Sequence, residues 1–196
     1  MRICVFEDQK SSDLYPMAMT RPTCELKCGH TLLWQKIARN FEDIEICFFV
    51  RDFLADVYRD KVPGAVNDGE KLTGTDLLFI NGRWLMGKGE LARTGDEHVG
   101  LCEGAVAYIR VKASTLEAYK GQPLDQLIET LKERLPNTQV KARMINYPWD
   151  LINYNPDAIQ EDFEAQNRQG IHCTLPRTTE LLGSEGNIYI APDAEI

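Results

Sequence analysis

The residues best suited to chemistry lie in a long loop that follows the first apolar segment of the chain. Residues 2–6 have the composition of a buried strand, and no helical or strand period appears between Glu7 and Pro22. In an open α/β sheet, ligands bind beyond the carboxyl ends of the strands, and a long loop at that position is usually functional. Arg21 precedes a proline and Lys27 follows six residues later, so the pair can clamp a diphosphate. The alternative, that both are solvated surface cations, remains open.

A second group of residues has the types that bind zinc or act in nucleophilic catalysis. Cys24, Cys28 and His30 lie close together, but structural zinc sites usually have two pairs of ligands, and no second pair occurs at a suitable spacing. His98 and His172 are isolated from the serine, cysteine and acidic residues that a catalytic triad requires. The cationic loop is therefore the stronger candidate site.

The elements that must position this loop alternate between strands and helices. Apolar, β-branched and aromatic residues predict strands at 2–6, 44–50, 77–81, 105–111 and 140–145. Apolar residues at three- and four-residue steps and turn signals predict helices at 31–40, 51–60, 123–135 and 157–169. Thr31 is the predicted N-cap of the first helix, Pro123 suits the first turn of the third, and Gly170 is the predicted stop of the last. The alternation predicts an α/β fold with a doubly wound, mainly parallel sheet.

The C-terminal segment follows a different pattern. After Pro176 the helical period disappears, and apolar or small residues recur on a six-residue rhythm that places Ile190 and Ile196 in equivalent positions. One such unit cannot bury its own apolar face and must stack on further copies. We therefore expect an α/β domain at 1–175, followed at 176–196 by a linker and the first hexapeptide-type turn of a β-helix. The chain then has the character of the front part of a longer protein.

The composition argues against several classes of partner. The 196 residues, 43% of them hydrophobic, are enough to bury the core of one domain. The formal net charge of −8 argues against a nucleic-acid backbone or an anionic membrane as a partner, although local cations and backbone N–H groups can still hold a small phosphate ligand. No apolar stretch approaches the roughly 20 residues of a membrane span. We expect a cytoplasmic protein with its six cysteines reduced.

Several short blocks resemble one known family. They are the residues at 14–17 (Leu-Tyr-Pro-Met), 20–22 (Thr-Arg-Pro), 25–29 (Glu-Leu-Lys-Cys-Gly), 31–33 (Thr-Leu-Leu), 80–83 (Ile-Asn-Gly-Arg) and 147–152 (Tyr-Pro-Trp-Asp-Leu-Ile), with Asn155. In this order they resemble the sugar-1-phosphate nucleotidyltransferases, in particular a divergent bacterial branch similar to the N-terminal domain of the bifunctional N-acetylglucosamine-1-phosphate uridylyltransferase and glucosamine-1-phosphate acetyltransferase. Members of that branch carry a left-handed parallel β-helix of hexapeptide repeats after this domain, and the tail of this chain resembles its beginning.

The resemblance implies an enzyme that joins an NTP and a sugar 1-phosphate into an NDP-sugar and releases pyrophosphate. It implies UTP and N-acetylglucosamine 1-phosphate as substrates, and therefore UDP-N-acetylglucosamine as product. Arg21 and Lys27 are the expected catalytic cations. Asn155 is an expected ligand of Mg²⁺, together with Asp150, because a hard cation prefers carboxylates. Nucleotide or sugar binding is expected from Asp8, Ser11, Ser12, Asn81, Gly82 and Trp149.

The sequence departs from the family pattern in the residues that would hold phosphate and metal. Residues 9–13 contain no glycine where the family has a glycine-rich phosphate-binding loop. Thr23 stands where the family has a lysine, and Arg83 stands where it has a metal-binding aspartate. These departures favour an alternative: a degenerate domain that binds a sugar nucleotide without turnover and serves a C-terminal hexapeptide acyltransferase. A third interpretation makes the domain an assembly module for a β-helix homotrimer.

Overall fold

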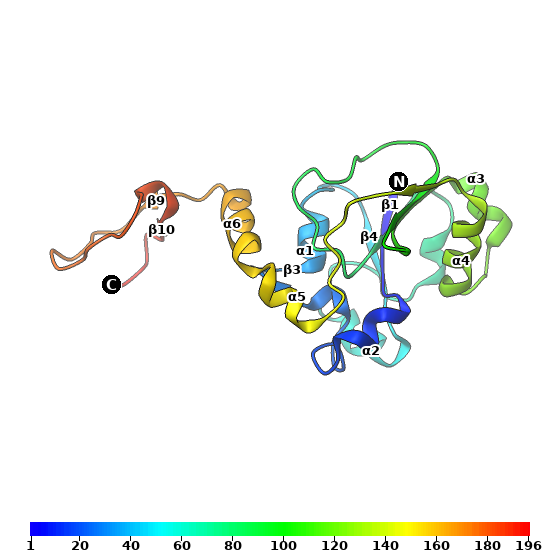
Figure 1. The fold of residues 1–196 in the computed structure, drawn as a ribbon, viewed down its shortest axis with the longest axis horizontal. Coiled ribbons are helices and arrows are strands. Elements are labelled where there is room, and N and C mark those ends of the chain that lie inside the picture. The colour runs from blue at the N-terminus through cyan, green and yellow to red at the C-terminus, as the bar shows by residue number, and fades with distance from the viewer.

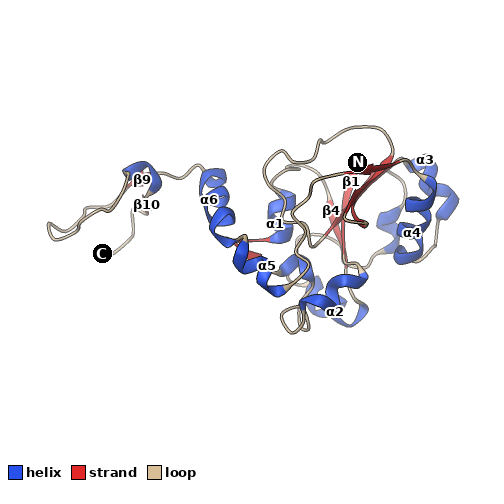
Figure 2. Cartoon of the chain, viewed as in Figure 1, coloured by secondary structure: helices blue, strands red, loops and turns tan.

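Five largely apolar segments and one polar edge strand pair into a six-stranded sheet, which the computed structural model of residues 1–196 places at the centre of the α/β domain (Figure 2). Its strands, in spatial order, are β4 (Ile46–Phe49), β1 (Arg2–Phe6), β5 (Leu77–Asn81), β7 (Ala105–Val111), β6 (His98–Cys102) and β8 (Asn137–Gln139). β4, β1 and β5 are parallel, β7 is antiparallel to both β5 and β6, and β8 is parallel to β6. The sheet is mostly parallel, as predicted, and the carboxyl ends of β4, β1 and β5 meet at one edge.

Helices cover both faces of this sheet, which confirms the predicted doubly wound arrangement (Figure 1). The helices involved are α1 (Leu33–Ala38), α2 (Asp52–Arg59), α3 (Ala113–Leu116) and α4 (Leu124–Arg134). α1 and α2 pack on one face, and α3 and α4 pack on the other. Because side chains alternate along a strand, Ile3 and Val5 of β1 enter the first layer, whereas Cys4 and Phe6 enter the second.

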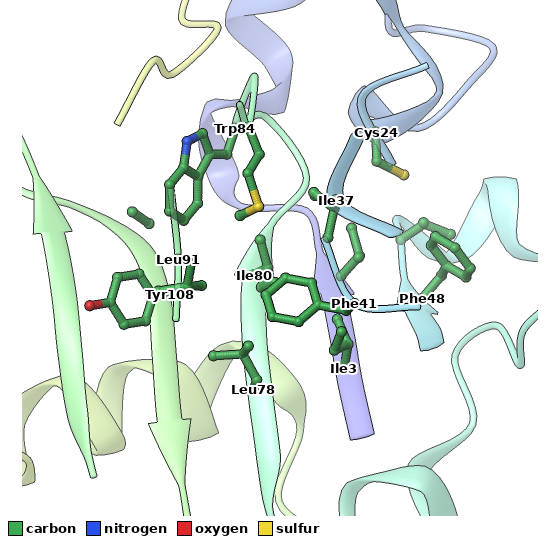
Figure 3. Close-up of a cluster of buried hydrophobic side chains, with 14 of the residues drawn as sticks. Ile3, Cys24, Ile37, Phe41, Phe48, Leu78, Ile80, Trp84, Leu91 and Tyr108 are labelled. Atoms are coloured by element: carbon green, nitrogen blue, oxygen red, sulfur yellow. The ribbon is translucent and has the colours of Figure 1, made fainter. Parts of the chain in front are cut away.

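The first of these two layers contains the larger aromatic side chains. Figure 3 shows Ile3, Leu78 and Ile80 from the sheet gathered with Ile37 and Phe41, which lie in and just after α1. All five are almost completely buried. This packing fixes α1 and the segment after it against β1 and β5.

The antiparallel pair of β6 and β7 depends on a tight hairpin that the apolar pattern did not indicate. Glu103 and Gly104 connect the two strands, and both have positive φ angles, 50° and 80°. Two consecutive residues of this kind form the turn whose twist matches that of an antiparallel pair. Inside β6, Gly100 lies flat against Tyr108, and a Cβ there would stand 2.3 Å from the Tyr108 ring.

The start of the first helix differs from the prediction. The predicted N-cap, Thr31, belongs to a short strand, β3 (Thr31–Leu32), which pairs with β2 (Lys27–Cys28). Its hydroxyl donates to Asp162 at 2.8 Å instead of capping α1, which begins at Leu33. The hydrogen bond to the distant Asp162 carboxylate therefore replaces the predicted capping interaction.

The last part of the α/β domain contains two helices where one was predicted. α5 (Pro148–Asn153) carries the Pro-Trp-Asp-Leu-Ile block, and α6 (Asn155–Gln166) follows it after a single residue. α6 ends at Asn167, which adopts a left-handed conformation with φ 48°, so Gly170 is not the residue that stops the helix. Asparagine can take the C-terminal position that glycine usually occupies.

The strand predicted at 140–145 does not form. β8 lies just before it, and the segment runs as an extended connection with one isolated bridge, between Met144 and Trp84. Met144 and Ile145 are nevertheless buried. The apolar pattern therefore predicted the burial of Met144 and Ile145 correctly, but it was wrong about strand pairing.

The C-terminal segment forms a separate two-stranded sheet. β9 (Gly170–Ile171) and β10 (Tyr189–Ile190) run parallel, with Gly170 opposite Tyr189. In Figure 1 this segment extends beyond α6, away from the central sheet. Short 3₁₀ helices complete the chain at Gln9–Leu14, Thr23–Glu25, Gly69–Leu72, Glu117–Tyr119 and Glu185–Asn187. None of the helices is both long and apolar enough to cross a bilayer.

Candidate functional site

A polar cavity of about 660 Å³ opens where β1 and β4 end. Its wall includes Glu7, Asp8 and the start of the 3₁₀ helix from the β1 side, and Arg51 and Asp52 from the β4 side. A smaller hollow of about 180 Å³ shares Glu7, Asp8 and Asp125 with it and continues toward α4. Ligands of open α/β sheets bind at this edge, and cavities of this size hold small-molecule ligands.

Asp8 is held by a buried arginine at the end of β5. The guanidinium of Arg83 donates from Nε to Asp8 Oδ1 at 2.8 Å and from Nη2 to Oδ2 at 2.6 Å. Asn81 Nδ2 adds a third hydrogen bond, at 2.8 Å. Burial raises the pKa of Asp8, but the hydrogen bonds and charge of Arg83 outweigh it, so this pKa lies below its ordinary value. The ionised form of Asp8 is therefore favoured.

Arg83, the partner of Asp8, is held in place by further hydrogen bonds. The side chain of Arg83 is fully buried and also donates to the Ile145 carbonyl at 3.0 Å and to Asn146 Oδ1 at 2.8 Å. Removing Asp8 from Arg83 would leave an uncompensated buried cation, which is strongly unfavourable. Arg83 thus joins the ends of β1 and β5 to the segment before α5.

A second buried carboxylate, Glu7, is paired with Arg51 at the end of β4. The backbone N–H of Arg51 donates to Glu7 Oε2 at 2.9 Å, and its Nε donates to the same oxygen at 3.2 Å. Glu7 Oε1 accepts the backbone N–H of Thr23 at 2.8 Å. Because Glu7 and Asp8 both have cationic partners, their charges do not exclude an anionic ligand from the cavity.

The structure places the predicted binding residues unevenly around this cavity. Asp8, Ser11 and Ser12 line it, and Asn81 reaches it through its bond to Asp8. Gly82 lies behind the wall, where a Cβ would stand 3.0 Å from the Cβ of Cys24.

Trp149 lies on α5 and does not line this cavity. Its side chain is 56% exposed and stacks on Tyr147, with ring centroids 4.6 Å apart. Neither ring is part of the buried core. The pair forms an exposed aromatic surface of the kind on which a sugar ring can stack.

The two predicted catalytic cations, Arg21 and Lys27, are both exposed. Arg21 is in the loop that follows the 3₁₀ helix, and its carbonyl accepts a hydrogen bond from Arg51 Nη2 at 3.0 Å. Lys27 is in β2, and it forms no ion pair with an acidic side chain. The backbone of Arg21 is therefore tied to Arg51 in the cavity wall, but neither Arg21 nor Lys27 is among the residues that line the cavity.

The predicted magnesium ligands have partners within the protein. Asp150 Oδ2 accepts the backbone N–H groups of Asn146 and Tyr147, both at 2.8 Å, at the start of α5. Asn155 Oδ1 accepts the N–H of Gly29 at 2.8 Å. No three His, Cys, Asp or Glu side chains gather as a ligand group. The chain alone therefore offers too few free oxygens to fit a resident magnesium site.

The cysteines near the cationic loop have roles in packing. Cys24 and Cys28 are buried, and all six cysteines are free thiols. Cys24 Sγ lies 3.4 Å from the Tyr58 hydroxyl, and burial raises its pKa to about 12. A thiol in that environment is inert.

One buried charge cluster lies outside the cavity and was not indicated by the sequence. Asp162 of α6 accepts hydrogen bonds from the backbone N–H groups of His30 and Thr31, at 3.0 and 3.1 Å. It also forms ion pairs with Lys36 and Arg39 of the α1 region. Burial raises its pKa, but the hydrogen bond from Lys36 and the other donors lower it to about 2. The cluster holds α6 against α1 and the β2–β3 hairpin.

The family-like sequence blocks did not indicate Glu7 and Arg51 as site residues. Each directly follows a predicted strand, and the two strands are neighbours, with Phe6 opposite Phe49. Charged residues at the carboxyl ends of adjacent parallel strands meet at the ligand-binding edge of the sheet. Applying this rule to every strand end would have indicated both.

The fold and the cavity together define a class of protein: an α/β domain whose mostly parallel sheet presents a polar ligand site at the carboxyl ends of its strands. A family model for sugar nucleotidyltransferases matches residues 3–169. This chain belongs to the sugar nucleotidyltransferase family, and it is a nucleotidyltransferase enzyme. Enzymes of this family act on nucleoside triphosphates and sugar phosphates and generally use a divalent metal.

Solved structures share the fold at low sequence identity. Molybdopterin-guanine dinucleotide biosynthesis protein A from Archaeoglobus fulgidus is 13% identical over 82% of this chain and 100% of its own, with a TM-score of 0.51. The inositol-1-phosphate CTP transferase from T. maritima is 12% identical over 82% of this chain and 96% of its own, with a TM-score of 0.50. At these identities the similarity concerns the fold alone. No curated protein sequence matches the chain.

Proposed function

We propose that this domain joins UTP and N-acetylglucosamine 1-phosphate into UDP-N-acetylglucosamine and pyrophosphate. The observation that carries the proposal is the cavity of about 660 Å³ at the ends of β1 and β4, lined by polar groups and bordered by the loop of Arg21. The resemblance of the Thr-Arg-Pro and Pro-Trp-Asp-Leu-Ile blocks supports this choice of base and sugar.

In the proposed reaction, a phosphate oxygen of the sugar 1-phosphate attacks the α-phosphorus of UTP. The bond from that phosphorus to the bridging oxygen breaks, and pyrophosphate leaves. Such a transfer needs in-line positioning and cations that neutralise the developing charge, rather than a nucleophilic side chain. Arg21 and Lys27 supply these charges in the proposal, while Ser11 and Ser12 offer hydroxyl donors from the cavity wall.

The sugar-binding role that we propose for Trp149 follows from its exposed stack with Tyr147. An aromatic face binds the apolar face of a sugar ring without selecting a phosphate. A Trp149→Ala variant therefore distinguishes sugar recognition from nucleotide recognition.

The experiment that tests the function is an assay of pyrophosphate release across a panel of NTPs and sugar 1-phosphates in the presence of magnesium. We expect release with UTP and N-acetylglucosamine 1-phosphate and much less with other pairs. Release with a different pair would keep the reaction and change the substrates. No release with any pair would contradict the proposal.

A second candidate is the domain that binds a sugar nucleotide without turnover and serves a hexapeptide acyltransferase. The observation that favours this candidate is that the carboxylate of Asp8 at the strand ends already accepts hydrogen bonds from Arg83 and Asn81. Binding of UDP-N-acetylglucosamine measured by calorimetry, without pyrophosphate release in the assay above, would favour this candidate.

We also propose that the C-terminal segment is the first coil of a parallel β-helix through which the full-length protein forms a homotrimer. The parallel pairing of β9 with β10 supports it, because Gly170 and Tyr189 are nineteen residues apart and three six-residue units almost span that interval. Sedimentation of a longer chain that carries further repeats tests the trimer.

A further inference from the structure

The loop from Tyr15 to Thr23 has few regular backbone hydrogen bonds of its own. Met19 N–H donates to the Pro16 carbonyl within the loop, and Ala18 N–H donates to the carbonyl of Leu14 just before it, both at 3.1 Å. A loop of this kind needs contacts from outside to hold one conformation.

One side chain supplies most of these outside contacts. The guanidinium of Arg51 donates to the Tyr15 hydroxyl at 2.9 Å, to the Ala18 carbonyl, and to the Arg21 carbonyl at 3.0 Å. The same guanidinium lies 5.6 Å from the centre of the Tyr15 ring. Arg51 therefore contacts the beginning, the middle and the end of the loop.

The carboxylate of Glu7 fixes this guanidinium and extends the same network. Glu7 pairs with Arg51 through both of its oxygens and accepts the N–H of Thr23, the last residue of the loop that carries Arg21. The side chains of Glu7 and Arg51 are 4% and 18% exposed. The ion pair is thus largely shielded from solvent, where charge-assisted hydrogen bonds are strongest, whereas the bonds from Arg51 to the Tyr15 hydroxyl and the Arg21 carbonyl lie at the surface.

We propose that Arg51 is a positioning residue that acts through Arg21, by holding the backbone of the Tyr15–Thr23 loop at the edge of the cavity. This inference rests on the proposed function for the role of Arg21. Arg51 sets where the Arg21 side chain stands relative to a bound nucleotide, and the charge that meets the phosphates is that of Arg21.

Lysine cannot replace Arg51 in this role. A guanidinium reaches Glu7, two carbonyls and a hydroxyl at once with its planar array of donors, whereas an ammonium presents a single centre. Lysine does keep the positive charge beside Glu7, so Arg51→Lys avoids the unpaired buried carboxylate that Arg51→Ala would create. Arg51→Lys is therefore the variant that loosens the loop without removing the ion pair.

The test is a double-mutant cycle on UTP affinity with magnesium, measured by calorimetry for the wild type, Arg51→Lys, Arg21→Ala and the double variant. We expect Arg51→Lys to weaken UTP binding about tenfold in the wild-type background, the factor for losing one charge-assisted hydrogen bond. In the Arg21→Ala background the same change should have little effect. Arg59→Lys is the matched control, since Arg59 lies exposed on α2 and pairs only with Asp56 at 3.0 Å.

Equal weakening by Arg51→Lys in both backgrounds, or none in either, would overturn the inference. Hydrogen exchange of the amides at 15–23 gives a readout independent of the ligand. Faster exchange in Arg51→Lys but not in Arg59→Lys is expected, and unchanged exchange would also overturn the inference. If the wild type binds no UTP, the proposed function fails, and the exchange rates still decide whether Arg51 holds the loop.

Discussion

Two carboxylates and two arginines meet at the ends of three neighbouring parallel strands. Glu7 and Asp8 follow β1, Arg51 follows β4, and Arg83 follows β5. Each carboxylate is paired with one arginine. These two ion pairs neutralise Glu7 and Asp8, whereas Asp52 and Asp125 also line the cavity without a cationic partner.

The pairing of Asp8 with Arg83 leads to a prediction about magnesium. Asp8, Asp150 and Asn155 all have hydrogen-bonded partners, so we expect no measurable magnesium binding to the free protein. With UTP present, the phosphates supply the missing oxygens and binding should appear. Calorimetric titration of magnesium with and without UTP measures both states. Tight binding without nucleotide would show that the chain provides a complete set of ligands.

Arg21→Ala tests the charge that the loop presents. We expect UTP affinity to fall about tenfold or more, because a charge-assisted contact to phosphate is lost. The free energy of unfolding should change by less than about 0.5 kcal/mol, since the side chain is exposed. Calorimetry and urea unfolding measure the two quantities. An unchanged affinity would return Arg21 to the class of solvated surface cations.

At the scale of the elements, the cluster around Asp162 holds the C-terminal helices on the domain. It joins α6 to Lys36 in α1 and to the backbone of the β2–β3 hairpin. The hairpin carries Lys27, and α5 packs on the same hairpin through the contact of Cys28 Sγ with the Leu151 carbonyl. The stability of these elements therefore depends on one buried carboxylate.

We expect Asp162→Asn to lower the free energy of unfolding by about 3 kcal/mol or more, because Lys36 then stays buried without its counter-charge. Glu164→Gln is the control on the same helix. Its side chain is exposed, and the change should cost less than about 0.5 kcal/mol. Urea unfolding at neutral pH compares the two. Similar stabilities for both variants would contradict the role of the cluster.

The same carboxylate predicts how stability depends on pH. The pKa of Asp162 is lowered from 3.8 to about 2 in the folded state, so its contribution is complete above pH 3.8 and is lost as pH falls toward 2. That contribution is about 2 kcal/mol. Urea unfolding between pH 5 and pH 2 should show that the free energy of unfolding falls less with decreasing pH in Asp162→Asn than in the wild type. Equal losses would mean that other carboxylates dominate.

At the scale of the whole molecule, we expect the α/β domain and the C-terminal segment to be stabilised separately. β9 and β10 bond to each other, through Gly170 N–H to the Ile188 carbonyl at 2.9 Å and His172 N–H to the Ile190 carbonyl at 3.0 Å. The hydrophobic clusters of the α/β domain contain no residue beyond Ala158. The domain core is therefore complete without the tail.

A chain ending at Gln169 should unfold within about 2 °C of the full chain, because it keeps every cluster of the core. A chain ending at Asn153 is the control. It loses Asp162 and leaves Lys36 buried and unpaired, so it should unfold at a much lower temperature. Thermal unfolding followed by circular dichroism measures both. A large loss on removing only the tail would show that the segment stabilises the domain.

The sequence by itself determined the α/β class and the four strongest strands, because these depend on local hydrophobic period and on residue type. It did not determine the hairpin at Glu103, where two residues with positive φ close the turn, or the short strand at Thr31, whose hydroxyl is taken by Asp162. Only the tertiary structure decided that Asp8 is paired with Arg83 and Glu7 with Arg51. These partners are more than forty residues apart in the chain, and they meet because parallel strands bring their carboxyl ends to one edge.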